Sequence, residues 1–89
     1  ALKNRSKHMR ANAAEVFGSV GERRAVVPLL NLLDDRDYEV RERVAQALGD
    51  IGDISASIAL RQAMKDQNRV VRTAATRALK KIMEANEIS

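Results

Sequence analysis

The sequence predicts an all-α superhelix, a solenoid of about five antiparallel helices, and three observations support this prediction. First, a period of 31 residues returns almost three times along the 89-residue chain. Second, each period holds two segments whose apolar residues have the spacing of one helical face. Third, aromatic residues make up only 2% of the chain, so the core must consist of Ala, Val, Leu and Ile, which suit closely packed helices.

The repeat is visible when positions 31 residues apart are compared. Apolar, basic, acidic and glycine positions all coincide, and the four glycines of the chain fall into two matched pairs. Agreement at so many positions indicates internal duplication. The matched sets include Met9/Val40/Val71, Arg10/Arg41/Arg72, Phe17/Leu48/Leu79, Val20/Ile51/Ile82, Gly18/Gly49, Gly21/Gly52, Leu29/Leu60 and Asp35/Asp66.

The first helix of each repeat, helix A, is expected over 22–34 and again over 53–65. In the first of these segments, apolar residues recur at the three-to-four-residue spacing of an amphipathic helix. Pro28 lies inside the segment and predicts a kink, because proline removes a backbone hydrogen bond. Its repeat mate is Ala59, so the two A helices are expected to differ in curvature.

The second helix, helix B, is expected over 6–19, 37–50 and 68–86. Ser6, Asp37 and Asn68 share one position of the repeat, and each has a short side-chain oxygen that can cap a helix N-terminus. Gly49 and Gly52 suit the other end, where glycine can adopt the left-handed conformation that stops a helix.

The register predicts one domain over 1–89, with an orphan helix B followed by repeats at 22–50 and 53–86. Ala1-Leu2 aligns with the end of a helix A, so we expect a fragment of a longer array. Its open end near Leu2 and Met9 would favour self-association. At the other end, residues 80–84 lack the Gly-x-x-Gly pattern, so the last helix should run on and close the solenoid with a polar cap.

Charge and composition limit the function classes. The net charge is +4, but the chain is basic at both ends and acidic in the middle, unlike a uniformly basic nucleic-acid binder. The absence of cysteine excludes disulfides and suits a reducing compartment, so we expect a cytoplasmic protein. No apolar run approaches the roughly 18 residues of a membrane span.

No catalytic, metal or cofactor site is predicted. His8 is the single histidine and falls at an exposed position of its helix, where a solvated surface side chain is expected. Asp34, Asp35 and Asp37 resemble the start of a calcium loop, but the glycine and terminal glutamate of such a loop are missing. The chain is therefore not expected to be an enzyme.

Residues 27–41 (VPLLNLLDDRDYEVR) and 45–52 (AQALGDIG) resemble a HEAT repeat, and more narrowly the short HEAT-like repeats of phycobilisome lyases. The resemblance implies that a turn aspartate and an arginine six residues later form a ladder between neighbouring turns. Asp35, Arg41, Asp66 and Arg72 match this pattern, with Arg72 held by Asp66, whereas Asn4 departs from it. Gly18, Gly21, Gly49 and Gly52 are also assigned structural roles.

The resemblance further implies that the B helices line a concave groove, where exposed residues that vary between repeats are free to contact a partner. We expect a protein-binding or scaffold module. The alternatives are a nucleic-acid-binding solenoid that uses basic segment 61–81, which lacks aromatics for base stacking, and a bilin-lyase-like subunit. The candidate partner-binding residues are Tyr38, Glu42, Arg43, Gln46, Arg69, Thr73 and Arg77.

Overall fold

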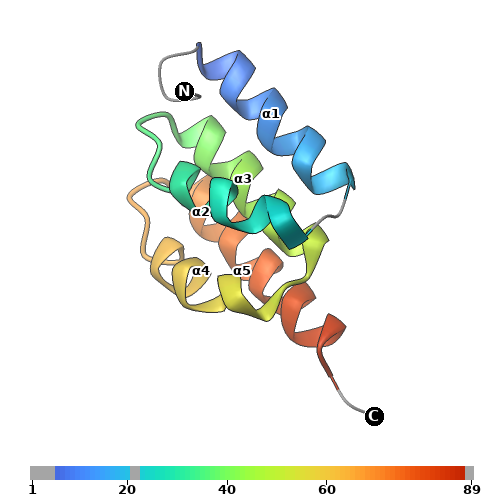
Figure 1. The fold of residues 1–89 in the computed structure, drawn as a ribbon. Helices are drawn as coiled ribbons and strands as arrows, with labels where there is room; N and C mark the ends of the chain where they lie inside the picture. The colour runs from blue at the N-terminus through green and yellow to red at the C-terminus, as the bar shows by residue number, and fades with distance from the viewer. Residues whose placement is uncertain (1–5, 21–22, 88–89) are drawn as a thin grey trace.

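Three long helices form one layer of the molecule. The computed structural model describes residues 6–20 and 23–87, and the Val20 side chain is not among the described parts. The long helices are α1 (Lys7–Val20), α3 (Tyr38–Ile51) and α5 (Arg69–Ala85), which lie side by side and run in the same direction (Figure 1). These three are the predicted B helices, and each begins and ends within two residues of its expected bounds.

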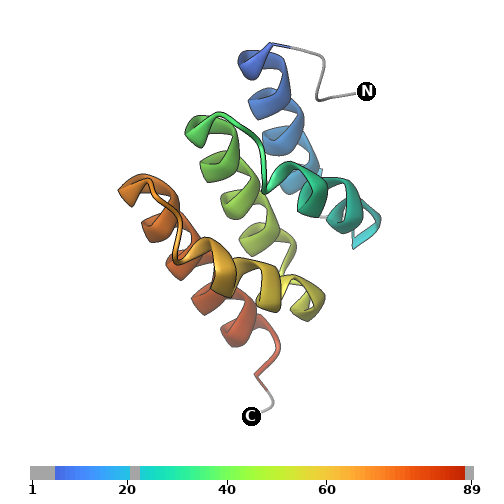
Figure 2. The ribbon, with the colours of Figure 1, turned by 90° about the vertical axis from the view of Figure 1, so that its left-hand side faces the viewer.

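Two shorter A helices form the second layer. Each starts with a 3-10 turn, η2 (Arg23–Ala25) or η3 (Ile54–Ala56), and continues as α2 (Val26–Leu32) or α4 (Ser57–Ala63). Figure 2 shows both beside the row of B helices. The predicted all-α architecture of five helices is confirmed.

Pro28 does not change the bounds of its helix. The two A helices occupy the same positions of the 31-residue repeat, although only one of them contains proline. Pro28 lies in the first turn of α2, where the missing N–H is tolerated.

The B helices start in two different ways. Ser6 and Asn68 cap their helices as predicted: the Ser6 hydroxyl accepts a backbone N–H at 3.3 Å, and the Asn68 carbonyl oxygen accepts the Val70 N–H at 2.8 Å. The prediction that Asp37 caps α3 is wrong. Its carboxylate accepts a hydrogen bond from the Arg10 guanidinium at 2.7 Å instead, because an ionic partner outcompetes a backbone N–H.

The glycines divide into two roles. Gly52 has a φ of 77° and ends α3 in the left-handed conformation, as predicted. Gly49 does not share this role and lies within α3, where a Cβ atom would come within 2.8 Å of the Ala78 Cα on α5. Gly18 has the same relation to Ala47. These two glycines therefore permit close helix crossing, while Gly21 lies outside the described residues.

The core is a seam of small and branched side chains between the two layers. The B helices contact one another more extensively than any of them contacts an A helix. No aromatic side chain is fully buried in the described residues, as the composition predicts. The largest buried apolar side chains are Leu29, Leu32, Val40, Val44, Leu48, Leu60, Val71 and Ile82.

The expected ladder joins each repeat to the next. Arg10 donates to Asp35 through Nε at 2.6 Å and Nη2 at 3.1 Å, and Arg41 donates to Asp66 through Nε at 2.8 Å and Nη2 at 3.1 Å. Arg41 also donates from Nη1 to the backbone carbonyl of Asp35 at 2.7 Å. One arginine thus ties together two successive turns.

Arg72 is held differently from the expectation. The Asp66 carboxylate is occupied by Arg41, so Arg72 reaches only backbone carbonyls, those of Asp66 at 2.7 Å and Gln67 at 3.0 Å. Arg72 thus keeps the contact with its own turn but has no carboxylate partner among the described residues. Asn4 lies outside that part of the chain.

The two rungs of the ladder differ in burial. The Arg10 and Asp35 side chains are 1% and 2% exposed, and Arg10 also binds Asp37. In the next rung, Arg41 and Asp66 are 17% and 14% exposed, and neutral Asn68 replaces the second carboxylate. The first rung is therefore a buried ion pair, to which the partly exposed carboxylate of Asp37 is added.

The two outermost B helices, α1 and α5, differ in the side chains that they expose. On α1, Met9 and Val16 are exposed, although the matching positions of α3 and α5 are buried. On α5, exposed Thr76 and Lys80 stand where α3 has buried Ala45 and Gly49. As predicted, α5 runs on and has a polar outer side, while self-association through the α1 end stays a prediction.

The close crossing of α3 and α5 generates the first testable prediction. Gly49→Ala should lower the free energy of unfolding by about 1–3 kcal/mol, because the added methyl overpacks the crossing. This loss should occur although alanine favours a helix interior by about 1 kcal/mol. Urea unfolding followed by circular dichroism measures the difference. Lys80→Ala, at the same repeat position without a helix above it, is the control, and a Gly49→Ala protein as stable as the parent would contradict the prediction.

The different burial of the two rungs generates the second testable prediction. Arg10→Met should destabilise the fold more than Arg41→Met, since leaving a buried carboxylate such as Asp35 unpaired costs about 3 kcal/mol or more. The same urea titrations compare the two variants. Adding Asp35→Leu to Arg10→Met should restore part of the loss. Equal losses in the two single variants would contradict the assigned difference in burial.

The third prediction concerns the stability of the fold at low pH. Burial by itself raises the pKa of Asp35, but the hydrogen bonds from Arg10 and the Asp37 N–H outweigh it and hold the pKa below its ordinary 3.8. Asp66 behaves alike, with Arg41 and the Asn68 N–H lowering its pKa. The unfolded chain therefore takes up protons first, and stability falls as pH drops below about 5. Urea midpoints across pH should show this decline, and Asp35→Asn should flatten it; an unchanged slope would contradict the prediction.

Candidate functional site

The outer surface of the B helices carries most of the predicted partner-binding residues. We call the exposed side chains of α1, α3 and α5 that the A helices leave uncovered the B face. This surface is hollowed between α1 and α3 and again between α3 and α5, which gives two grooves, each between one B helix and the next. The differences between them therefore follow directly from the residues that were exchanged.

The groove between α1 and α3 is bridged by two ion pairs. Lys7 Nζ lies 2.7 Å from Glu39 Oε1, and Arg43 Nη1 lies 3.0 Å from Glu15 Oε2. The hydrogen bond with Glu39 raises the pKa of Lys7, and the same bond lowers the pKa of Glu39. Both groups thus stay charged at neutral pH. The hollow that remains is about 90 Å³, lined by Lys7, His8, Ala11, Asn12, Glu39, Glu42 and Arg43.

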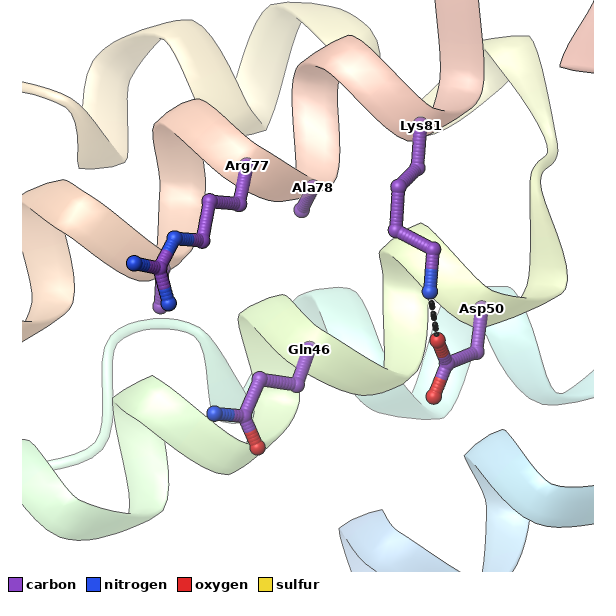
Figure 3. Close-up of a pocket in the computed structure, with 6 residues that line it drawn as sticks. Gln46, Asp50, Arg77, Ala78 and Lys81 are labelled. Atoms are coloured by element: carbon purple, nitrogen blue, oxygen red, sulfur yellow. Dashed lines mark hydrogen bonds and ion pairs between the residues drawn. The ribbon is translucent and has the colours of Figure 1, made fainter. Parts of the chain in front are cut away.

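The groove between α3 and α5 contains a larger hollow of about 280 Å³. Arg77 and Lys81 project into it from α5, and Gln46 and Asp50 from α3, with Ala78 between the two cations (Figure 3). Lys81 and Asp50 form an ion pair at one end. In the described part of the chain, Arg77 has neither a hydrogen bond nor an ion pair.

The repeat explains why the groove between α3 and α5 is open at this hollow. The positions of the Glu15–Arg43 pair are held by Gln46 and Ala74 one repeat later. Alanine cannot reach across the groove, so no side chain bridges it at this point. The Lys7–Glu39 pair is likewise replaced, by Tyr38 and Val70, both exposed.

The structure brings together only some of the predicted residues. Gln46 and Arg77 line the larger hollow, and Glu42 and Arg43 line the smaller one. Tyr38, at the first position of α3, and Arg69 and Thr73 on α5 are exposed but line neither hollow. All three lie in the N-terminal part of their helices.

Sequence reasoning missed the Asp50–Lys81 pair and the two alanines that line the larger hollow, Ala74 and Ala78. Asp50 and Lys81 occupy the same repeat position with opposite charge, so they face each other across neighbouring helices. That signal was readable from the sequence. Ala74 and Ala78 gave no such signal, because their importance comes from the space that they leave empty.

A third hollow, of about 170 Å³, lies between the A helices beside the turn of Asp66. Of its two acidic groups, Asp66 is already used, since it binds Arg41. The lining residues are Leu30, Leu33, Asp34, Ala59, Gln62, Ala63 and Asp66.

The described residues show no arrangement for metal binding or membrane insertion. No group of three or more His, Asp or Glu side chains within residues 6–20 and 23–87 could hold a metal ion. None of the described helices combines the length and apolar character needed to cross a bilayer.

Comparison with known proteins agrees with the repeat architecture. No curated protein shows significant sequence similarity to the chain. The family model that describes HEAT repeats matches residues 1–80. Repeats of this kind generally mediate protein–protein interaction and scaffolding and are typically not enzymes. The matched segment covers most of the chain and all the helices described above except the end of α5, and the chain therefore belongs to the HEAT repeat family.

Proposed function

We propose that the chain is a protein-interaction module that binds its partner through the B face. The observation that carries this proposal is the groove between α3 and α5. It combines an unpartnered guanidinium, an amide, an apolar floor and an exposed aromatic side chain at one end. Arginine and tyrosine are the residue types that most often dominate protein–protein interfaces.

Charge placement favours a protein over a nucleic acid. Arg61 lies in α4 and Lys65 in the turn after it, whereas Arg77 and Lys81 line the groove between α3 and α5. Lys80 is on the outer side of α5. The basic segment 61–81 is therefore spread over several surfaces and does not form one phosphate track. On the B face itself, acidic groups such as Glu39 and Asp50 interrupt the positive charge.

A bilin-lyase-like role has less support. Tyr38 is the single exposed aromatic side chain in the described residues, and Phe17 packs against the core. A conjugated tetrapyrrole would be expected to contact a larger apolar or aromatic surface. The B face offers mainly polar contacts.

The fourth prediction compares two faces of the molecule. In pull-downs from extracts of the source cells, Tyr38→Ala/Arg43→Glu should reduce recovery of a bound protein at least about tenfold, because hot-spot truncations cost this much. Ile58→Ala/Arg61→Glu makes the same kinds of change on exposed residues of α4 and should leave recovery unchanged. Quantitative mass spectrometry measures recovery, and circular dichroism checks that both variants stay helical.

The outcomes separate the function classes. Loss of the bound protein in the α4 variant, with retention in the B-face variant, would overturn the proposal. Binding to DNA in low salt that weakens steeply as salt rises would favour the nucleic-acid alternative. We expect no such salt-dependent DNA binding.

A further inference from the structure

We propose that the hollow between α3 and α5 receives a single carboxylate side chain, from a Glu or Asp of an acidic segment in the protein partner. Arg77 is the cation that pairs with it. This inference rests on the proposed function, because it names the chemistry that the B face recognises. It goes beyond that proposal in assigning one subsite and one kind of side chain.

The first groove shows what the second one lacks. Between α1 and α3, the Glu15 carboxylate on one helix meets the Arg43 guanidinium on the next at 3.0 Å. Between α3 and α5, Gln46 and Ala74 hold these two positions, and a guanidinium comes instead from Arg77, further along α5. The second groove thus has lost the Glu15–Arg43 type of bridge, and its Asp50 is bound to Lys81, so Arg77 has no carboxylate partner among the described residues and an incoming carboxylate could pair with it.

The size and lining of the hollow fit this ligand. Ala74 and Ala78 form an apolar floor, against which the methylene groups of a glutamate or aspartate can pack. The Gln46 amide can donate a second hydrogen bond from the opposite helix. A guanidinium binds a carboxylate through two parallel hydrogen bonds, which gives direction as well as charge. The volume of about 280 Å³ accommodates one side chain and not a folded element.

The Asp50–Lys81 pair limits the hollow to one acidic group. Lys81 is already bound to Asp50, so the positive charge at that end is neutralised. A chain of closely spaced phosphates along the groove would also meet the Asp50 carboxylate at the other end of the hollow, and like charges in proximity repel. A single carboxylate that enters beside Arg77 avoids this contact. The arrangement therefore favours a protein side chain over a nucleic-acid backbone.

The surroundings of the hollow would attract an acidic segment. Arg69, Arg77 and Lys80 are exposed on α5, and no acidic residue precedes Glu84 on this helix. Such a concentration of positive charge steers negatively charged partners toward the surface. Tyr38 and Val70 then offer an exposed apolar contact at the N-terminal end of the same groove.

The test, our fifth prediction, uses the whole chain and two blocked tripeptides, acetyl-Ala-Glu-Ala-amide and acetyl-Ala-Gln-Ala-amide. NMR titration at physiological salt follows the methyl signals of Ala74 and Ala78 and the side-chain amide of Gln46. The glutamate peptide should shift these signals saturably, with an affinity about tenfold above that of its glutamine twin. Arg77→Gln should abolish the difference, whereas Arg61→Gln, an equal loss of charge at an exposed position of α4, should retain it.

Three results would overturn the proposal. One is the absence of saturable shifts up to the solubility limit of the glutamate peptide. Another is an equal effect of Arg61→Gln and Arg77→Gln, which would indicate attraction to the net positive charge of the chain in general. The third is displacement of the peptide by a short single-stranded oligonucleotide at equal concentration. Since the titration reads the hollow directly, its failure is distinguishable from failure of the pull-down experiment, which reads the whole B face.

Discussion

The close crossing of the B helices is the constraint on which the rest of the structure depends. At Gly18 and Gly49, the neighbouring helix approaches so closely that a Cβ atom would overlap an alanine backbone. This short separation brings each arginine of the ladder within reach of the aspartate in the following turn. It also makes the grooves on the B face narrow enough for Lys7 and Arg43 to bridge one of them. A wider crossing would remove both sets of contacts.

The ladder uses this short separation to join the repeats at their turns. Because Arg41 binds the Asp66 carboxylate and the backbone carbonyl of Asp35, it fixes the spacing between two successive turns. Buried ion pairs contribute little net stability when desolvation is counted, but they select one arrangement strongly. The arginine ladder therefore specifies the register of stacking, while the alanine and leucine seam provides most of the stabilisation.

Much of the fold was predictable because equivalent positions of the repeat can be compared within this one sequence. Helix existence, order and approximate bounds follow from the 31-residue period, and the Arg10–Asp35 and Arg41–Asp66 contacts follow from the family pattern. The role of Asp37 was not predictable in the same way, because capping competes with a buried guanidinium that only the tertiary structure brings near. Gly49 was misassigned because its sequence spacing resembles a helix end, while the reason for glycine lies on α5. At the B face, the exposed residues were predictable, but the hollow was not, since it arises from the short side chain of Ala74.

A close helix crossing requires small residues, and this requirement also explains why the outer side of α5 differs from that of α3. A further B helix could pack on α5 at the same distance only if small residues stood at positions 76 and 80. Thr76 and Lys80 stand there instead, and both are exposed. A lysine at the crossing point would keep another helix away, so the close stacking that builds the first two grooves is not available on this side. The positive charge of Lys80 is consequently left free to contribute to the field around α5, beside the groove that holds Arg77. In this way, the residues that interrupt the packing pattern also make α5 the most basic edge of the B face.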